Sequence, residues 1–313
     1  MQCDGKELRV LLFGSGEIGT AVARELSKQG HTFHVVSRSP NRNLDLLPGP
    51  SNFTACELGI QLLPENLLDN ITTIIYTAGI PNPALPWNTL PIVVHQELHP
   101  LQSLCTELDA RGWSGRLIFT SSGGTVYGSA NKGKWKETSA CHPVSPYGVA
   151  KLAAECLLDM YGTHSGTEIC VTRISNVIGT KRNSSHGIGF VQTAVENTLK
   201  GKPLVLFGDG QIIRDFVDVF DAAKCLVDIA LLNAPLPSIV NISSGMGLSL
   251  QTVVQEIATV LNVEALIDHQ PRRPLDIQYN VLDNTLLRSL VNLELMSLSE
   301  SVRRIIGEIE TEF

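Results

Sequence analysis

Two side chains that can exchange protons stand four positions apart in the segment SPYGVAK, residues 145–151. Ser145 is a favourable N-cap and Pro146 suits a first helical turn, so the segment predicts a helix with Tyr147 and Lys151 on one face. A free phenol, with a pKa near about 10, is a poor base at neutral pH. A nearby ammonium and a positive helix end both favour the phenolate, so Tyr147 and Lys151 form a candidate proton-transfer centre.

The segment FGSGEIG, residues 13–19, has the glycine spacing of a dinucleotide-binding turn. The pattern G-x-G-x-x-G stands between a predicted strand and a predicted helix, which is the context that this motif needs. Glycine tightens the turn and lets pyrophosphate approach the backbone amides at the helix N-terminus. We therefore expect a dinucleotide to contact Gly14, Gly16, Glu17, Ile18 and Gly19.

The end of the second predicted strand bears on which dinucleotide binds. Chains that bind NAD usually place an acidic residue there to hold the ribose hydroxyls. This chain has Ser37 followed by Arg38. A guanidinium pairs with phosphate and no carboxylate repels it, so the pair favours NADP(H). If Arg38 is only a solvated loop residue, the site accepts NAD.

Strands and helices alternate along the first half of the chain. This order predicts an α/β fold, a doubly wound parallel sheet of the Rossmann type with helices on both faces. We expect strands at 8–14, 32–37, 52–58, 71–79, 116–122 and 168–175. We expect helices at 17–30, 95–112 and 147–162, the second of them bent by Pro100.

The regular alternation of strands and helices ends after about residue 180. We expect a loop at 182–189, short strands at 204–210, 214–219 and 239–245, and helices at 188–200, 249–261 and 284–306. The predicted organisation is a dinucleotide-binding domain over 1–180, which carries the Tyr/Lys centre. A smaller substrate-binding lobe over 181–313 follows, with some segments returning to the first domain. Ligands of such folds sit beyond the carboxyl ends of the strands.

Composition narrows the class of partner. The formal net charge is −7 and no basic stripe is present, which argues against nucleic acid but leaves anionic small molecules open. The first residues lack the apolar length of a signal peptide, and no later run is long enough to span a membrane. The seven cysteines are scattered and include no CxxC pair, which favours reduced thiols in the cytoplasm. No cluster has metal-ligand spacing.

Several ordered motifs together resemble the extended short-chain dehydrogenase/reductase family, and within it the nucleotide-sugar epimerases and dehydratases. The resemblance runs from about residue 8 to about residue 290. Besides the glycine turn and SPYGVAK, it rests on YTAG at 76–79, SSGGTVYG at 121–128, TRISNVIG at 172–179, FGDGQIIRDFVDVFDAA at 207–223 and RRPLDIQYNVLD at 272–283.

The resemblance implies a role for each matching position. Tyr147 would be the general acid or base at a sugar hydroxyl or ketone, and Lys151 would bind the nicotinamide ribose. Asn176 would contact the substrate, while Arg214 and Arg273 would clamp its diphosphate. For Arg214 the alternative is a salt bridge to Asp215 or Asp218, and for Arg273 it is a surface position with Arg272 as the substitute. The further dinucleotide contacts would be Glu57, Leu58, Ala78, Gly79 and Ser121.

Two positions depart from the family pattern. Phe13 stands where the family usually begins its turn with glycine, and Gly123 stands where the third catalytic hydroxyl normally lies. Either Ser122 or Thr125 must then supply that hydroxyl, or the proton relay is altered, and we favour Thr125 slightly over Ser122.

The leading hypothesis is a nucleotide-sugar 4-epimerase. An NADP(H)-dependent 4-ketoreductase with the same tyrosine and lysine is the alternative, and a non-catalytic dinucleotide-binding regulator is a lesser one. A dehydratase is less favoured because Gly123 and Gly124 stand where that class usually has an acidic pair. By analogy with the family we expect a homodimer formed through the helices near 92–111 and 147–161.

Overall fold

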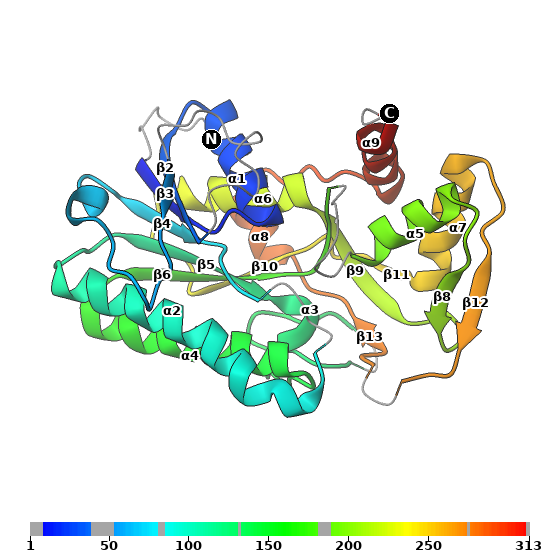
Figure 1. Ribbon diagram of the computed structural model, residues 1–313, viewed down its shortest axis with the longest axis horizontal. Helices are drawn as coiled ribbons and strands as arrows, with labels where there is room; N and C mark the ends of the chain where they lie inside the picture. The colour runs from blue at the N-terminus through cyan, green and yellow to red at the C-terminus, as the bar shows by residue number, and fades with distance from the viewer. Residues whose placement is uncertain are drawn as a thin grey trace.

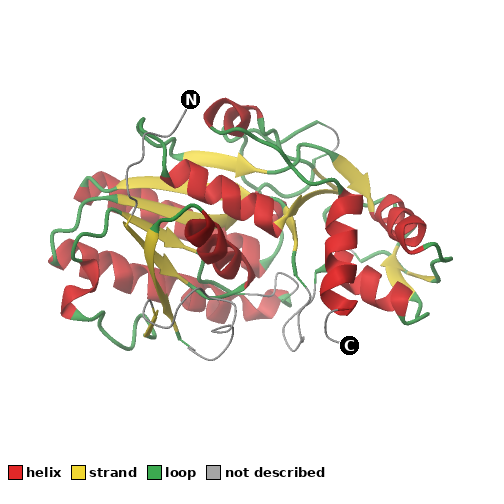
Figure 2. Cartoon of the chain, turned by 90° about the horizontal axis from the view of Figure 1, so that it is seen from above, coloured by secondary structure: helices red, strands yellow, loops and turns green. Residues whose placement is uncertain are grey.

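The computed structural model describes residues 9–38, 53–80, 85–130, 133–180, 189–273 and 276–310. Cys3 lies outside these ranges, and so does the predicted loop at 182–189 except for its last residue. Two bodies lie along the long axis of the molecule, a large sheet flanked by helices and a smaller lobe at one end of it (Figures 1 and 2).

Within the described residues, seven parallel strands form the main sheet in the order β10-β6-β5-β4-β1-β2-β3. The predicted doubly wound sheet is therefore confirmed. Its strands are apolar and β-branched on both faces, as strands covered on both sides must be. They are β1 (Arg9–Phe13), β2 (Thr32–Ser37), β3 (Phe53–Ala55), β4 (Thr73–Tyr76), β5 (Arg116–Ser122), β6 (Glu168–Ile174) and β10 (Ile239–Ile242).

Two layers of helices cover the two faces of this sheet (Figure 1). On one face, α1 (Glu17–Lys28), α6 (Val219–Ala230) and α8 (Thr285–Leu290) close one apolar core. On the other, α2 (Leu90–Ala110) and α4 (Pro146–Ser165) close a second. Pro100 lies inside α2, which nevertheless runs as one helix. The short helix α3 (Gly123–Val126) follows β5, and the 3₁₀ turns η4 (Glu65–Leu68) and η5 (Trp87–Thr89) lie in connections.

The smaller lobe has its own core and its own small sheets. One sheet joins β7 (Asn176–Ile178), β9 (Ile213–Asp218), β11 (Gly247–Ser249) and β13 (Tyr279–Asn280), and the other joins β8 (Leu204–Phe207) to β12 (Ile267–Gln270). Three helices pack on them, α5 (Phe190–Leu199), α7 (Leu250–Leu261) and α9 (Leu298–Glu310). The domain boundary at residue 180 stays a prediction, but α6, β10 and α8 do return to the main sheet.

Two helical assignments differ from the sequence prediction. The helix α6 was not predicted, although Asp218 caps it by accepting a hydrogen bond from the Phe220 amide at 2.9 Å. The predicted helix at 284–306 is two helices, α8 and α9. It is interrupted because Ser297 and Glu300 form a capping box that starts α9: the Ser297 amide donates to the Glu300 carboxylate at 2.7 Å, and the Glu300 amide donates to the Ser297 hydroxyl at 3.3 Å.

Candidate active site

The first turn of α4 brings Tyr147 and Lys151 together as predicted. The Ser145 hydroxyl accepts a hydrogen bond from the Gly148 amide at 3.2 Å, and Pro146 fills the first helical position. The Lys151 ammonium lies 5.8 Å from the centre of the Tyr147 ring and 4.8 Å from that of Phe119. It also donates to the Thr120 carbonyl at 3.1 Å, so both residues lie at the carboxyl end of β5.

Glu97 on α2 is a third ionisable group of this centre, and the sequence analysis missed it. Its carboxylate accepts a hydrogen bond from the Lys151 ammonium at 2.6 Å, with side-chain exposures of 2% for Glu97 and 4% for Lys151. One signal was available. Glu97 shares the buried helix face with Leu101, Leu104 and Leu108, and a carboxylate on an apolar stripe demands a partner.

The resting ionisation of Tyr147 differs from the sequence expectation. Burial raises the pKa of Tyr147 above its ordinary value. Lys151 lowers that pKa, as expected, and so does a hydrogen bond with the Ser122 side chain. Glu97, however, raises it, so the net direction is upward and the phenol holds its proton in the chain without coenzyme.

The segment after β5 shows which hydroxyl lies beside Tyr147. The Ser122 side chain lowers the pKa of Tyr147, whereas the Thr125 hydroxyl donates to the Ser122 carbonyl at 3.3 Å. A Cβ atom at Gly123 would lie 2.5 Å from Cδ1 of the buried Leu282, so no side chain fits there without repacking. A Cβ atom at Gly124 would lie 3.6 Å from the Asn176 amide, which is an ordinary contact.

Ser121 points into a buried polar cluster of its own. Its hydroxyl donates to the Glu155 carboxylate at 2.5 Å. That carboxylate also accepts hydrogen bonds from the Arg173 guanidinium, the shortest at 2.7 Å, and both charges are nearly inaccessible to solvent. The Ser121 hydroxyl is thus engaged by Glu155.

The glycine turn fits a dinucleotide pyrophosphate. Gly14 has φ +98°, and a Cβ atom there would lie 2.7 Å from the Ala78 amide nitrogen, so only glycine suits the position that follows Phe13. A Cβ atom at Gly19 would lie 2.0 Å from the Gly14 carbonyl, which keeps α1 close to the sheet. At Gly16 the space is open to 4 Å, and this N-cap gives α1 no side-chain cap. The turn therefore leaves room for an anion at a helix N-terminus.

The other predicted dinucleotide contacts surround this turn. Ser37 ends β2, where its hydroxyl accepts a hydrogen bond from Ser15 at 2.8 Å, and the adjacent Arg38 is exposed. Gly79 lies past the end of β4, where a Cβ atom would be 2.9 Å from the Lys151 ammonium. Among the rest, Ile18 and Ala78 are half-buried, Glu57 is exposed and Leu58 is buried.

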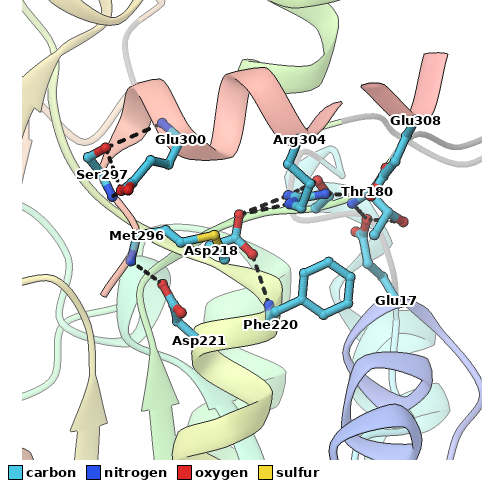
Figure 3. Close-up of polar contacts among 11 residues, drawn as sticks. Glu17, Thr180, Asp218, Phe220, Asp221, Met296, Ser297, Glu300, Arg304 and Glu308 are labelled. Carbon is cyan, nitrogen blue, oxygen red and sulfur yellow. Dashed lines mark hydrogen bonds and ion pairs between the residues drawn. The ribbon is translucent and has the colours of Figure 1, made fainter. Parts of the chain in front are cut away.

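Glu17, also in the turn, reaches toward the smaller lobe (Figure 3). Its carboxylate accepts a hydrogen bond from the Thr180 amide at 2.5 Å. The neighbouring Gly179 carbonyl accepts a hydrogen bond from Arg304 of α9 at 2.9 Å. The same guanidinium contacts the Asp218 carboxylate at 2.8 Å, and Asp218 is fully buried at the start of α6. The glycine turn, α6 and α9 are therefore joined through a short polar chain.

The predicted substrate side chains lie on the lobe side of the centre. Asn176 on β7 donates to the Asp215 carbonyl at 3.0 Å and lies beside Gly124. Arg214 on β9 is paired in register with Asn280 of β13, whose amide donates to the Gly123 carbonyl at 3.1 Å. The strand that carries Arg214 is thereby tied to the segment that carries Ser122.

Arg214 is a half-buried cation with little compensation. Burial lowers the pKa of Arg214 to about 10, and Arg273 adds to this effect while Asp276 opposes it. The alternative salt bridge is absent among the described residues, because Asp218 pairs with Arg304 and Asp215 accepts from Ser244, Gly245 and Leu282. Arg273 is exposed, contacts Asp276 at 3.0 Å and lies 4.1 Å from the Phe207 ring centre.

The described residues were also compared with the requirements of a metal site and of a membrane-spanning helix. No group of three or more His, Cys, Asp or Glu side chains in them could hold a metal ion. None of their helices combines the length and the apolar character needed to cross a membrane.

Comparison with known sequences gives a consistent result. A sequence model described as the NAD dependent epimerase/dehydratase family matches residues 10–243. A putative UDP-glucose 4-epimerase of Methanocaldococcus jannaschii is 30% identical over 192 residues, which are 61% of this chain and 62% of that relative. An uncharacterized UDP-glucose epimerase of Bacillus subtilis is 28% identical over 297 residues, 87% of this chain and 85% of the relative. A GDP-6-deoxy-D-mannose reductase of Pseudomonas aeruginosa is 31% identical over 192 residues, 60% of this chain and 61% of the relative.

Solved structures share the fold over nearly the whole chain. A UDP-glucose 4-epimerase of Thermotoga maritima with UDP-glucose has a TM-score of 0.86 at 23% identity, covering 97% of this chain and 99% of that one. A UDP-glucose 4-epimerase of Thermus thermophilus in complex with NAD has a TM-score of 0.86 at 24% identity, covering 98% of this chain and 100% of that one. At these sequence identities the likeness shows a shared fold, which includes both the main sheet with its helices and the smaller lobe.

Proposed function

We propose, given that the chain belongs to the NAD dependent epimerase/dehydratase family, that it is a nucleotide-sugar 4-epimerase. The observation that carries the proposal is the meeting of Tyr147, Lys151 and Ser122 at the carboxyl end of β5, beside Gly79 and close to the glycine turn. This places a proton-transfer group next to a turn that fits a dinucleotide.

In the proposed reaction Tyr147 exchanges a proton with the C4 hydroxyl of the sugar. Tyr147 would first have to lose the proton that it holds in the chain without coenzyme. Its phenolate would then accept the hydroxyl proton while the C4 hydrogen leaves as a hydride, and the sugar would become a 4-ketone. The reverse step returns a hydride to the other face of C4 and the proton from Tyr147 to the oxygen. A bound nicotinamide coenzyme would supply the hydride acceptor and donor, so neither substrate nor coenzyme is consumed.

Ser122 is the hydroxyl that we assign as the partner of Tyr147 at the reacting oxygen. Its lowering effect on the pKa of Tyr147 supports this choice over Thr125, whose hydroxyl is directed to the Ser122 carbonyl. Lys151 then fixes the phenol electrostatically and offers its remaining donor capacity to the coenzyme ribose.

For the coenzyme, the family as a whole is described as NAD dependent. We propose that this chain also accepts NADP(H), because Arg38 stands exposed next to Ser37 at the end of β2 and no carboxylate occupies either position. The remaining contacts would come from the glycine turn, that is Gly14, Gly16, Glu17, Ile18 and Gly19, and from Glu57, Leu58, Ala78, Gly79 and Ser121.

For the substrate, the half-buried charge of Arg214 supports a diphosphate. A guanidinium that burial and Arg273 both disfavour is stabilised when a doubly charged anion enters. Asn176, beside Gly124, would orient the sugar or the nucleotide from the same side. The relatives' names point to UDP-glucose as the first substrate to test.

The cytoplasm is the proposed compartment, and the six cysteines that the structure describes are free thiols, which supports a reducing environment.

The experiment that tests the function is the substitution Tyr147→Phe, with Tyr161→Phe on the same helix as the control. We expect Tyr147→Phe to lose about 10²- to 10⁴-fold in turnover of UDP-glucose, the usual contribution of a positioned acid or base. Coenzyme affinity, measured by fluorescence titration, should stay unchanged in both variants. Turnover that survives Tyr147→Phe would overturn the mechanism, and a wild-type protein that binds coenzyme but turns over no nucleotide sugar would favour the non-catalytic regulator.

One observation favours a second candidate, an NADP(H)-dependent 4-ketoreductase. The raised pKa of Tyr147 leaves a phenol, which is the form that donates a proton to a ketone. A relative named as a reductase fits this reading. Activity without added nicotinamide, with coenzyme released only on denaturation, would support the epimerase. Stoichiometric oxidation of NADPH would support the reductase.

A further inference from the structure

Two helices that cover the same face of the main sheet each bury one charge at its carboxyl edge. Glu97 comes from the first half of α2 and Lys151 from the second turn of α4, and their side chains meet at 2.6 Å. The Glu97 carboxylate also accepts a hydrogen bond from the Ile80 amide at 3.3 Å, just after Gly79. Both partners are almost inaccessible to solvent, so their attraction is little screened.

Space around the pair is filled. A Cβ atom at Gly79 would lie 2.9 Å from the Lys151 ammonium and 3.2 Å from the Glu97 carboxylate. Any residue larger than glycine at this position would therefore crowd the pair. The Thr120 carbonyl holds the ammonium from the other side at 3.1 Å. Lys151 is thus fixed by Glu97 and by the β5 backbone at once.

The other charged groups near the pair are compensated. Glu155 on α4 acts on Lys151, but its carboxylate is paired with Arg173 of β6 at 2.7 Å. Tyr76 on β4 faces Glu97, and burial raises the pKa of this phenol well above its ordinary value, so it stays neutral. Glu97 is therefore the group that balances the charge of Lys151.

We propose that Glu97 is a positioning residue, which holds Lys151 and offsets part of its charge beside Tyr147, so that the ammonium does not outweigh the burial that keeps this phenol protonated. The ammonium alone would favour the phenolate, whereas a carboxylate in contact with the ammonium opposes that effect on a group a few ångströms away. In the resting site the phenol then gives up its proton only in alkaline solution. Its catalytic consequence rests on the proposed function, but the ionisation of Tyr147 does not.

The test is a titration of Tyr147 in the protein without coenzyme. Tyrosinate absorbance is followed against pH, and each curve is compared with that of the same protein carrying Tyr147→Phe, which isolates the one phenol. We expect Glu97→Gln, which keeps the shape and removes the charge, to lower the midpoint by about one unit or more. The matched control is Glu107→Gln, another buried glutamate of α2 that pairs with Arg111 instead. An unchanged midpoint in Glu97→Gln would overturn the proposal.

A second variant guards against loss of folding, since Glu97→Gln leaves a buried ammonium without its partner. Glu97→Asp keeps the charge but withdraws it by one methylene, and we expect a smaller shift in the same direction. If neither variant moves the midpoint, Glu97 has only a structural role.

The pH–rate profile of nucleotide-sugar turnover separates this inference from the proposed function. We expect the limb that reports Tyr147 to move to lower pH in Glu97→Gln by the same amount as the titration. A shifted titration in a protein that turns over no nucleotide sugar would sink the function and leave the inference standing. Normal turnover with an unmoved limb would overturn the inference on Glu97 and leave the proposed function standing.

Discussion

At the scale of single residues, the space around Gly123 decides which hydroxyl can stand beside Tyr147. The position has no room for a side chain, because Leu282 is fully buried against Val126 and Tyr127. Ser122, one residue earlier, carries the hydroxyl that lowers the pKa of the phenol. Gly123 departs from the family pattern, and its lack of a side chain fits the close packing of β13 and the residues after it.

We expect Gly123→Thr to destabilise the fold by about 1–3 kcal/mol, the usual cost of overpacking a filled core. Gly124→Ser is the matched control, since its Cβ atom meets nothing closer than 3.6 Å. Urea unfolding followed by tryptophan fluorescence measures both. Equal unfolding midpoints for the two variants would contradict the packing argument.

Arg214 is the second residue whose environment predicts an outcome. Arg214→Met should raise the KM for a nucleotide sugar by roughly 10- to 150-fold, because hydrogen bonds to charged groups contribute about 1.5–3 kcal/mol. Thermal stability should stay the same or rise, since a half-buried charge near Arg273 is removed. Steady-state kinetics and a thermal melt check the two effects, with Arg288→Met as the control. A lower melting temperature with an unchanged KM would indicate a structural role for Arg214.

At the scale of elements, local patterns predicted the main sheet and most of its helices, because buried strands and capped helices carry their signals within a few residues. The position of Tyr147 beside Lys151 follows in the same way from helix geometry. The pairing of Glu97 with Lys151 joins residues 54 positions apart, and no local pattern encodes it. The start of α9 shows the opposite case, because the capping box at Ser297 and Glu300 is a local pattern that indicates a helix start.

The attachment of α9 depends on Arg304. Its guanidinium joins the buried Asp218, the Gly179 carbonyl and Glu308, and lies over the Phe220 ring (Figure 3). We expect Arg304→Met to destabilise the protein by about 3–5 kcal/mol, because it leaves the Asp218 carboxylate buried without its cation. Chemical denaturation measures the loss.

The control for this prediction is the neighbouring Arg303→Met, since Arg303 is exposed on the same helix. Equal stability of the two variants would show that the contacts of Arg304 contribute nothing measurable. In the double variant Asp218→Asn with Arg304→Met, we expect a loss smaller than the sum of the single losses.

At the scale of the whole molecule, the predicted homodimer would form through α2 and α4. A pocket of about 600 Å³ lies between the two helices, and Met160 at its edge is 69% exposed. Its lining is formed by Gln102, Cys105, Thr106, Asp109, Leu157, Met160, Tyr161 and His164. The predicted homodimer would bury this surface.

We expect Met160→Asp to convert a dimer to monomers, because the predicted interface would then bury an unpaired charge. Sedimentation velocity reads the change directly. Leu199→Asp, at an exposed apolar position of α5, is the control and should leave the dimer intact. A wild-type protein that sediments as a monomer would remove the homodimer from consideration.

The return of α6 and β10 to the main sheet has a consequence for synthesis of the chain. The core beside α1 is completed by Val219, Ala222, Leu226 and Val240, all of which leave the ribosome after residue 180. At about 5–20 residues per second, roughly 3–11 s pass between the emergence of β6, which ends at residue 174, and that of α6, which ends at residue 230. During this interval the apolar face of α1 lacks its partner helix. A nascent chain halted near residue 180 should therefore be a ligand for chaperones that bind exposed apolar surface.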